Sequence, residues 1–340
     1  MNAVPYFLRT GKNAKFPYFA RCVARELLVP AALRRAQRER VLVSIAERPD
    51  RDEIEARAAY YCKPGAGERP LPPPGEPLPA GAPAPIRIRD QRMPWKGQVY
   101  YFDTREWLRW FPQDLRWLHV PGDVTAVPPA PAIVKSRPIA EDRGPASANA
   151  GAVLLNLNKV RHFIFVRDGL RFADKLPRAV FRGKVKGKPK RIALFERFFG
   201  RPGLDLGDTS SRAVRPEWAN GRLSIAEQLR FRYVLAIEGN DVASNLKWVL
   251  SSNSLAVMPR PEYETWFQEG LLEPGVHYVE IRPDYADLEE KLAWYDAHPG
   301  EAERILAAAH AWVDRFRDPA RERLVSLRVL DRYFRATGQR

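Results

Sequence analysis

Cysteine and long apolar runs are scarce in this sequence. Two cysteines, Cys22 and Cys62, occur in 340 residues, which excludes a disulfide scaffold and a Cys-rich zinc or iron–sulfur centre. No apolar run approaches the roughly 18 residues that a membrane span needs. Residues 1–15 also lack the apolar stretch of a secretory signal. We therefore expect a soluble, cytoplasmic protein.

Several common catalytic motifs are missing as well. Neither the P-loop pattern GxxxxGK[ST] nor the serine elbow G-x-S-x-G occurs. The five histidines show no metal spacing on a single helix, so we expect no metal site. The two-acid pattern Asp50-Arg51-Asp52 is of the kind that metal-dependent sugar transferases use. It stands where a helix begins, however, and favours an N-cap at Asp50 with Glu53 completing a capping box.

Positive charge is what the chain has in excess. Lys and Arg number 56 against 41 Asp and Glu, a net charge of +15. Nine Trp, 12 Tyr and 16 Phe are enough for a large core and exclude a wholly disordered chain. The basic balance favours an anionic partner, which leaves a nucleotide, a nucleic acid and an anionic membrane surface open.

The order of periodic segments predicts an α/β protein. Residues 15–61 show helical spacing, and Pro64–Pro85 holds nine prolines in 22 residues, which predicts a linker or insertion. The second half alternates strands, such as 179–182 and 255–258, with helices, and this pattern is typical of a doubly wound parallel sheet. We also expect a strand at Gln98–Phe102 and a helix beginning at Tyr263.

The densest basic stretch lies where a predicted strand meets a predicted helix. Phe165–Gly200 contains 11 Lys and Arg against three acids. Ligands of open α/β sheets bind at the carboxyl ends of strands, and helix N-termini attract phosphate. Arg182 and Arg191 are therefore candidates to clamp a diphosphate, with Gly183 allowing close approach of the backbone. The alternative is a solvated basic loop.

A second polar turn follows the predicted strand at 233–237. Gly239 and Asn240 suit a tight turn, and Asp241 or Ser244 is placed to cap the next helix or to hold ribose hydroxyls. The residues alone leave both roles open. Candidate catalytic carboxylates near the ends of the N-terminal strands are Asp103, Asp123, Glu141 and Asp142.

The motifs around these residues resemble glycosyltransferase family 90. The resemblance covers nearly the whole chain except the Pro-rich stretch, and its bacterial lipopolysaccharide-core (LpsA-like) branch matches best. The segments that carry it, in order, are KSRPI at 135–139, VLLNLNKVRHF at 153–163, FRG at 181–183, YVLAIEGNDVASNLKWVLSSNSLAVMP at 233–259, Trp266, EP at 273–274, HYV at 277–279 and DL at 287–288.

This resemblance implies a GT-B architecture, with two Rossmann-like domains facing a cleft and helices at both ends of the chain. We expect an N-terminal helical segment at 1–63, the linker at 64–85, an acceptor-side domain at 86–170, a nucleotide-sugar domain at 171–317 and a final helix at 318–340. The implied activity is inverting hexosyl or pentosyl transfer without a metal or cofactor. A nucleotide sugar, commonly UDP-linked, would be the donor.

The resemblance also implies site residues. Arg182, Gly183 and Arg191 map to the diphosphate region, and the donor loop and the start of its helix map to Glu238, Gly239, Asn240 and Asn245. Eukaryotic members carry Arg in place of Asn245, and Lys247 is a candidate replacement. Their catalytic Asp lies shortly after a Ser-Lys element. Here Glu141 and Asp142 lie six and seven residues after Lys135, and we favour Asp142 as the base.

The expected acceptor is a lipopolysaccharide core or another lipid-linked surface glycan. The protein would then be held on the anionic inner membrane by arginines of its N-terminal helices. These arginines are Arg21, Arg25, Arg34, Arg35 and Arg38. Two other classes remain open: a transferase that uses a different nucleotide-linked donor, and a basic nucleic-acid-binding protein. No recognisable DNA or RNA module supports the latter, and we expect no nucleic acid partner.

Overall fold

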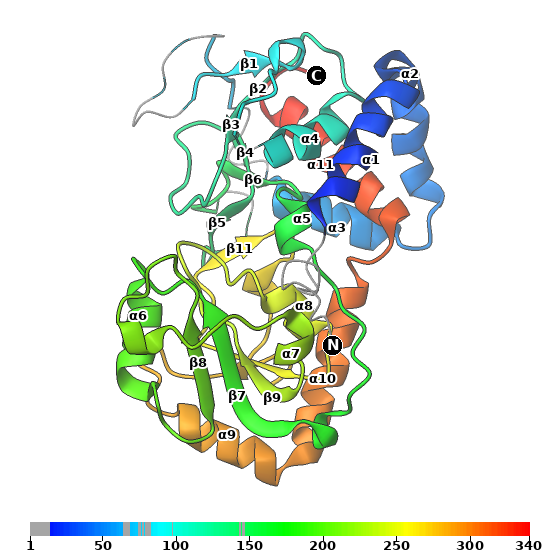
Figure 1. Cartoon of the computed structure of the whole chain (residues 1–340). Helices are drawn as coiled ribbons and strands as arrows, with labels where there is room; N and C mark the ends of the chain where they lie inside the picture. Colours follow the sequence, from blue (N-terminus) through cyan, green and yellow to red (C-terminus); the bar gives the residue numbers. More distant parts are fainter. Residues whose placement is uncertain are drawn as a thin grey trace. The chain divides into compact units, whose positions relative to one another are not determined.

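The computed structural model describes residues 14–63, 69–73, 76, 78, 83–96, 98–142, 144 and 147–340. More than half of the expected linker at 64–85 lies outside them. The chain divides into two compact units (Figure 1). Unit 1 contains Arg161–Glu262 and Glu269–Arg315. Unit 2 contains the described parts of Ala14–Val160, together with Tyr263–Gln268 and Phe316–Arg340. The domain borders expected from the sequence lie after residues 170 and 317, whereas the chain passes between the two units after Val160 and after Arg315.

Unit 1 is built on a five-stranded sheet in which every pairing is parallel. The strand order is β12-β10-β9-β7-β8. The strands are β7 (Leu176–Gly183), β8 (Leu204–Asp208), β9 (Phe231–Leu235), β10 (Leu255–Met258) and β12 (Val279–Glu280). Strands β7, β9 and β10 overlap the strands expected at 179–182, 233–237 and 255–258. The parallel sheet confirms the α/β class.

Helices α6 (Pro189–Phe198), α7 (Ile225–Gln228) and α8 (Leu246–Leu250) lie between successive strands from β7 to β10, as a parallel sheet requires. Helices α9 (Leu288–Ala297) and α10 (Pro299–Asp314) follow β12, and 3₁₀ turns lie at Phe172–Asp174, Pro216–Trp218 and Glu269–Leu271. The core between sheet and helices is aromatic and aliphatic, with Phe181, Phe195, Trp218 and Leu235 all buried. Pro189 occupies the first turn of α6, where its missing N–H costs no helical hydrogen bond.

Unit 2 combines long helices with short strands (Figure 1). Its helices are α1 (Lys15–Leu28), α2 (Ala31–Val43), α3 (Arg51–Tyr61), α4 (Gln98–Leu108) and α11 (Pro319–Ala336), with 3₁₀ turns at Ser44–Glu47 and Ile88–Asp90. A parallel sheet joins β3 (His119–Val120), β4 (Ala132–Val134) and β6 (Ala152–Leu154). Two antiparallel pairs join β1 (Ile86–Arg87) to β2 (Arg116–Trp117) and β5 (Ser136–Pro138) to β11 (Tyr263–Thr265). The short helix α5 (Lys159–His162) lies at the border of the two units.

Three local expectations are wrong. Gln98–Phe102 begins helix α4 instead of forming a strand, because its buried residues, Phe102 and Trp107 among them, recur along one helical face. The segment that begins at Tyr263 is strand β11, paired with β5. Asp50 makes no capping bond, because its carboxylate contacts Arg48 and Arg321, at 2.6 Å in each case. None of the described helices is both long and apolar enough to cross a bilayer.

Candidate functional site

The predicted donor residues of unit 1 gather at the carboxyl edge of its sheet. Strand β7 ends at Gly183, a basic loop follows, and helix α6 begins at Pro189. The neighbouring strand β9 ends at Leu235 and leads through Glu238 and Gly239 toward α8. The two loops meet because β7 and β9 are adjacent, and Arg191 of α6 donates to the carbonyl of Glu238 at 3.2 Å.

The guanidinium of Arg191 stands at the centre of this edge. Its Nη2 donates to the Ile237 carbonyl at 2.7 Å and its Nη1 to the Lys184 carbonyl at 2.8 Å. Within the described part of the chain these bonds go to carbonyl oxygens, and no carboxylate forms an ion pair with Arg191. Burial, together with the nearby charge of Arg161, lowers the pKa of Arg191 to about 10. The site therefore holds a partly desolvated cation that an anionic ligand would stabilise.

Two glycines leave the space that this guanidinium occupies. A Cβ at Gly239 would stand 3.2 Å from Arg191 Nη2. A Cβ at Gly183 would stand 3.2 Å from Nη1 and 2.7 Å from the Phe181 ring, over which the guanidinium lies at 5.4 Å. The side chain of Arg191 thus fits between two strand ends only because both positions lack a side chain.

An acid on the edge strand holds the basic loop in place. Asp208, the last residue of β8, accepts hydrogen bonds from the backbone N–H groups of Val185 at 3.1 Å, Ser210 at 2.8 Å and Val214 at 3.0 Å. Burial opposes ionisation, but these bonds and the Ser210 hydroxyl keep the pKa of Asp208 below its ordinary value. We did not predict this role, although an acid at a strand end followed by Thr and Ser is a recognisable turn signal.

Lysines at the start of α6 connect the two loops. Lys188 donates to the side-chain oxygen of Asn240. Lys190 forms ion pairs with Glu238 at 2.7 Å and with Glu262 at 2.8 Å. Burial opposes its charge, yet the two carboxylates raise the pKa of Lys190. Glu238 therefore acts here by fixing a basic side chain, and Glu262 is a further member of the site that the sequence did not single out.

Three predicted donor residues are instead engaged within the protein. Arg182 pairs with Asp205 of β8 at 2.7 Å, with a side chain only 5% exposed. Lys247 forms an ion pair with Glu269, and their side chains are 0% and 1% exposed. Asn245 donates to the Leu235 carbonyl at 3.0 Å. These contacts give Arg182, Lys247 and Asn245 roles in the packing of unit 1.

The two capping candidates do not cap helix α8. This helix begins with Asn245 at its N-cap position and has no side-chain capping bond. Asp241 is buried, and its backbone carbonyl accepts from the N–H of Gly239 at 3.1 Å. This bond closes the turn that holds Gly239 beside Arg191.

The candidate bases belong to unit 2. Glu141 and Asp142 are both exposed on the loop after β5, and the Asp142 carboxylate accepts from the Gly144 N–H at 2.7 Å. Asp103 is buried, which raises its pKa, and it accepts from the Tyr18 hydroxyl at 2.7 Å. Asp123 pairs with the buried Lys135 at 2.6 Å. Of the four carboxylates, Glu141 and Asp142 are the accessible ones without an ion pair among the described residues.

Among the residues that the structure describes, no group of three or more His, Cys, Asp or Glu side chains is arranged to hold a metal ion.

Glycosyltransferases are among the known proteins to which this chain is similar. Residues 151–320 match the family described as Glycosyl transferase family 90. O-glucosyltransferase LpsA of Dichelobacter nodosus is 42% identical over 239 residues, which cover 70% of this chain and 73% of that protein. Protein O-glucosyltransferase 3 of Homo sapiens is 26% identical over 171 residues, covering 48% of this chain and 33% of that protein. The matched region contains the whole Arg191 site, and the chain belongs to glycosyltransferase family 90.

Proposed function

We propose that this glycosyltransferase moves a sugar, with inversion and without a metal, from a UDP-linked donor to a lipopolysaccharide core or related surface glycan. The observation that carries the proposal is the Arg191 site, a half-buried cation without an ion pair among the described residues, at the carboxyl edge of a parallel sheet inside the region that matches the family. The relative named O-glucosyltransferase LpsA supports glucose as the first donor sugar to test.

The donor diphosphate would lie against the start of α6. Helix N-termini present free N–H groups and partial positive charge, which favours phosphate. Lys188, Lys190 and Arg191 add three cationic side chains at this point. Their charge would stabilise the departing nucleoside diphosphate as the glycosidic bond breaks. We propose the GT-B arrangement on the same basis, since each unit has its own parallel sheet.

A carboxylate of unit 2 would act as the general base. Asp142 would take the proton from the acceptor hydroxyl as that oxygen attacks the anomeric carbon, and Glu141 is the alternative. The bond from the Gly144 N–H fixes the orientation of the Asp142 carboxylate. The variant Asp142→Asn should lose sugar transfer and keep donor binding, with Glu141→Gln as the matched control. The reverse result would assign the base to Glu141.

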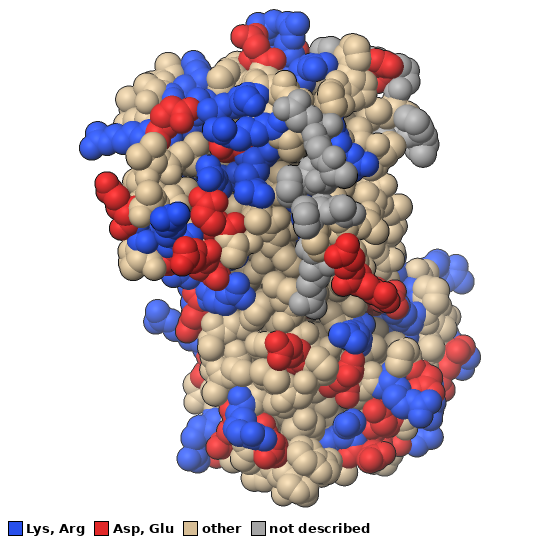
Figure 2. Space-filling view, turned by 180° about the vertical axis from the view of Figure 1, so that it is seen from behind, with Lys and Arg blue, Asp and Glu red and all other residues tan. Residues whose placement is uncertain are grey.

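A lipid-linked acceptor suggests that the protein binds the membrane surface through α1. Phe16, Val23 and Leu27 share one face of this helix and are 83%, 45% and 78% exposed. On the face of unit 2 seen in Figure 2 (upper part of the view), Lys and Arg side chains gather into a broad patch. We propose that the apolar face enters an anionic leaflet while nearby cations add about 1 kcal/mol each.

Flotation with vesicles tests this surface. Recovery should be higher with anionic than with neutral vesicles, and the double variant Phe16→Ser/Leu27→Ser should reduce it. Val276→Ser is the control, because Val276 is an apolar residue on the surface of unit 1, 41% exposed and outside α1. Equal recovery on both vesicle types would refute the membrane proposal and leave the transferase proposal standing.

Calorimetric titration tests the donor site. We expect UDP and UDP-glucose to bind equally well with and without EDTA, and Arg191→Gln to weaken both by at least tenfold, the scale of one charge-assisted contact. Arg178→Gln is the control, because Arg178 is an exposed arginine on the same strand as Gly183. Binding of other nucleotides but no nucleotide sugar would favour a different group transferase, and salt-sensitive binding of nucleic acid would favour the third class.

A further inference from the structure

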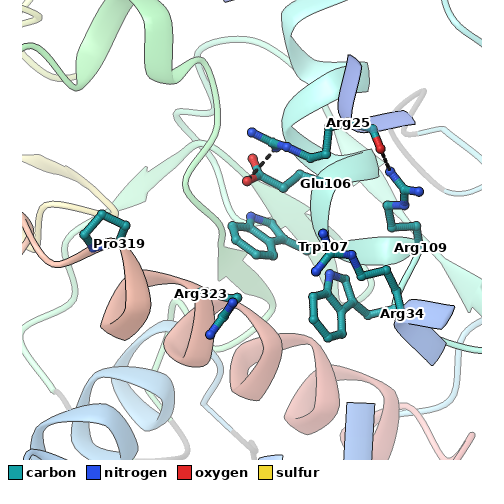
Figure 3. Close-up of a pocket in the computed structure, with 8 residues that line it drawn as sticks. Arg25, Arg34, Glu106, Trp107, Arg109, Pro319 and Arg323 are labelled. Carbon is teal, nitrogen blue, oxygen red and sulfur yellow. Dashed lines mark hydrogen bonds and ion pairs between the residues drawn. The ribbon is translucent and has the colours of Figure 1, made fainter. Parts of the chain in front are cut away.

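Unit 2 contains a cavity of about 180 Å³ whose walls carry four arginines. Arg25 comes from α1, Arg34 from α2, Arg109 from the end of α4 and Arg323 from α11 (Figure 3). The volume is many times the roughly 10–15 Å³ that one water molecule needs. Arginines of three separate parts of the chain, namely the α1–α2 pair, the end of the α4 segment and α11, therefore line one cavity.

The carboxylates around this cavity do not balance the arginines. Glu106 is the one acid in its wall. It contacts Arg25 at 2.6 Å and is shared with Lys159, so its charge is already divided between two cations. Arg34 and Arg323 form no ion pair with any residue that the structure describes, and the Arg34 guanidinium lies 4.9 Å from the ring of Trp110. The cavity therefore keeps a surplus of positive charge.

Arg109 is the most tightly held of the four arginines. Its side chain is only 2% exposed, and its terminal nitrogens donate to the carbonyl oxygens of Arg25, at 2.8 Å, and of Val29, and to Glu26 at 3.2 Å. Its Nε atom is buried without a hydrogen-bond partner among the described residues, and so is the indole Nε1 of Trp107. Because both of these atoms are closed off from the cavity, the cations that a ligand can reach without displacing a partner are Arg34 and Arg323.

The arginines also disfavour one another's charge. Burial, followed by Arg323 and Arg25, lowers the pKa of Arg34. Burial lowers the pKa of Arg109 as well, and Arg34 adds to this while Glu26 opposes it. An anion in the cavity would relieve this repulsion. Cations that outnumber the carboxylates beside them are an arrangement expected of a binding site.

We propose that this cavity binds a phosphate group. Guanidinium groups match phosphate oxygens in bidentate geometry, and several of them converging on one space suit a dianion with more than two acceptor oxygens. Arg34 and Arg323 supply the charge that has no ion pair among the described residues. The group would be carried by a membrane lipid or a soluble phosphate compound. All lining residues belong to unit 2, so the inference does not depend on the donor site of unit 1.

Calorimetry with inorganic phosphate on the full-length protein tests the site. Arg34→Gln and Arg323→Gln should each weaken phosphate binding at least tenfold, whereas Arg40→Gln, at an exposed arginine of the same helix α2, should not. Because neither residue has an ion pair to lose, both variants should unfold at the same temperature as the wild type or higher when phosphate is absent. That readout separates loss of the site from loss of the fold.

A second arm identifies the source of the phosphate. If the two variants also lose recovery on vesicles containing phosphatidic acid, a lipid phosphate is the natural occupant. If they lose inorganic phosphate binding but float like the wild type, the occupant is soluble. The proposal is overturned if the wild type binds no phosphate at tens of millimolar. It is equally overturned if the variants bind phosphate as tightly as the wild type, because the anion would then lie elsewhere.

Discussion

The variant Lys247→Met tests whether Lys247 stabilises the fold or binds the donor. The Lys247 ammonium pairs with the Glu269 carboxylate, and the two side chains are almost fully buried, at 0% and 1% exposure. Met fills a similar volume but leaves the Glu269 carboxylate without its cation. Breaking a buried pair in this way costs about 3–5 kcal/mol. That is a large share of the 5–15 kcal/mol that usually stabilises a domain.

The expected loss is large enough to measure directly. At roughly 2–4 °C per kcal/mol for a protein of 150–250 residues, Lys247→Met should lower the melting temperature of unit 1 by about 6–20 °C. The double variant Lys247→Met/Glu269→Leu should recover most of this loss, because no unpaired charge remains. UDP affinity, measured below the transition, should change less than threefold. A stable single variant with weakened UDP binding would refute this reasoning and return Lys247 to the donor site.

Three further predictions concern single positions. Burial lowers the pKa of His119 to about 4, so the stability that its neutral form contributes is fully present above pH 6.5, and up to about 3 kcal/mol of it is lost as the pH falls from 6.5 to 4. The variant His119→Phe keeps a ring stacked on Trp117, and its free energy of unfolding, measured by urea titration, should lack that loss. A pH profile identical to that of the wild type would contradict this prediction. Gly239→Ala should weaken UDP binding with a stability cost of about 1–3 kcal/mol, because the new Cβ stands 3.2 Å from the Arg191 guanidinium; unchanged affinity would mean that the position of Arg191 does not matter. Asp208→Ala should speed proteolysis at the basic loop, because three backbone N–H groups lose their acceptor; a wild-type cleavage pattern would show that other contacts hold the loop.

The sequence predicted the edge of the sheet at which the site lies. Parallel strands end at one edge, so the basic run after residue 182 and the polar turn after residue 237 were expected on the same side of the sheet. The two loops meet because β7 and β9 are adjacent, and the sequence did not predict that strand order. The same reasoning could not say which cations remain available. The sequence gives no reason to distinguish Arg182 from Arg191. The structure distinguishes them, because Arg182 pairs with Asp205 while Arg191 donates to carbonyl oxygens.

Other features were invisible because they depend on contacts between distant segments. Tyr263–Thr265 is aromatic and polar, as the start of a helix can be, and it forms a strand because β5 offers an unpaired edge. Asp50 has the right position for a cap, but Arg321, 271 residues away, contacts its carboxylate. The cavity of unit 2 brings together arginines of four helices, and no periodicity within one helix could reveal it.

Charge is distributed in this protein in two contrasting ways. Deeply buried cations such as Arg137 and Lys247 are matched by carboxylates, Glu264 at 2.8 Å in the first case, as the desolvation cost of a buried charge demands. Arg191 in unit 1, and Arg34 and Arg323 in unit 2, differ from these cations, because none of the three is fully buried and none forms an ion pair with a described residue. Arg191 and Arg34 are half-buried and Arg323 is exposed, so solvent or a ligand can reach them. Departures from local charge matching concentrate where a protein binds its ligands, so these three arginines lie at the two places, one in each unit, where we propose that anions bind.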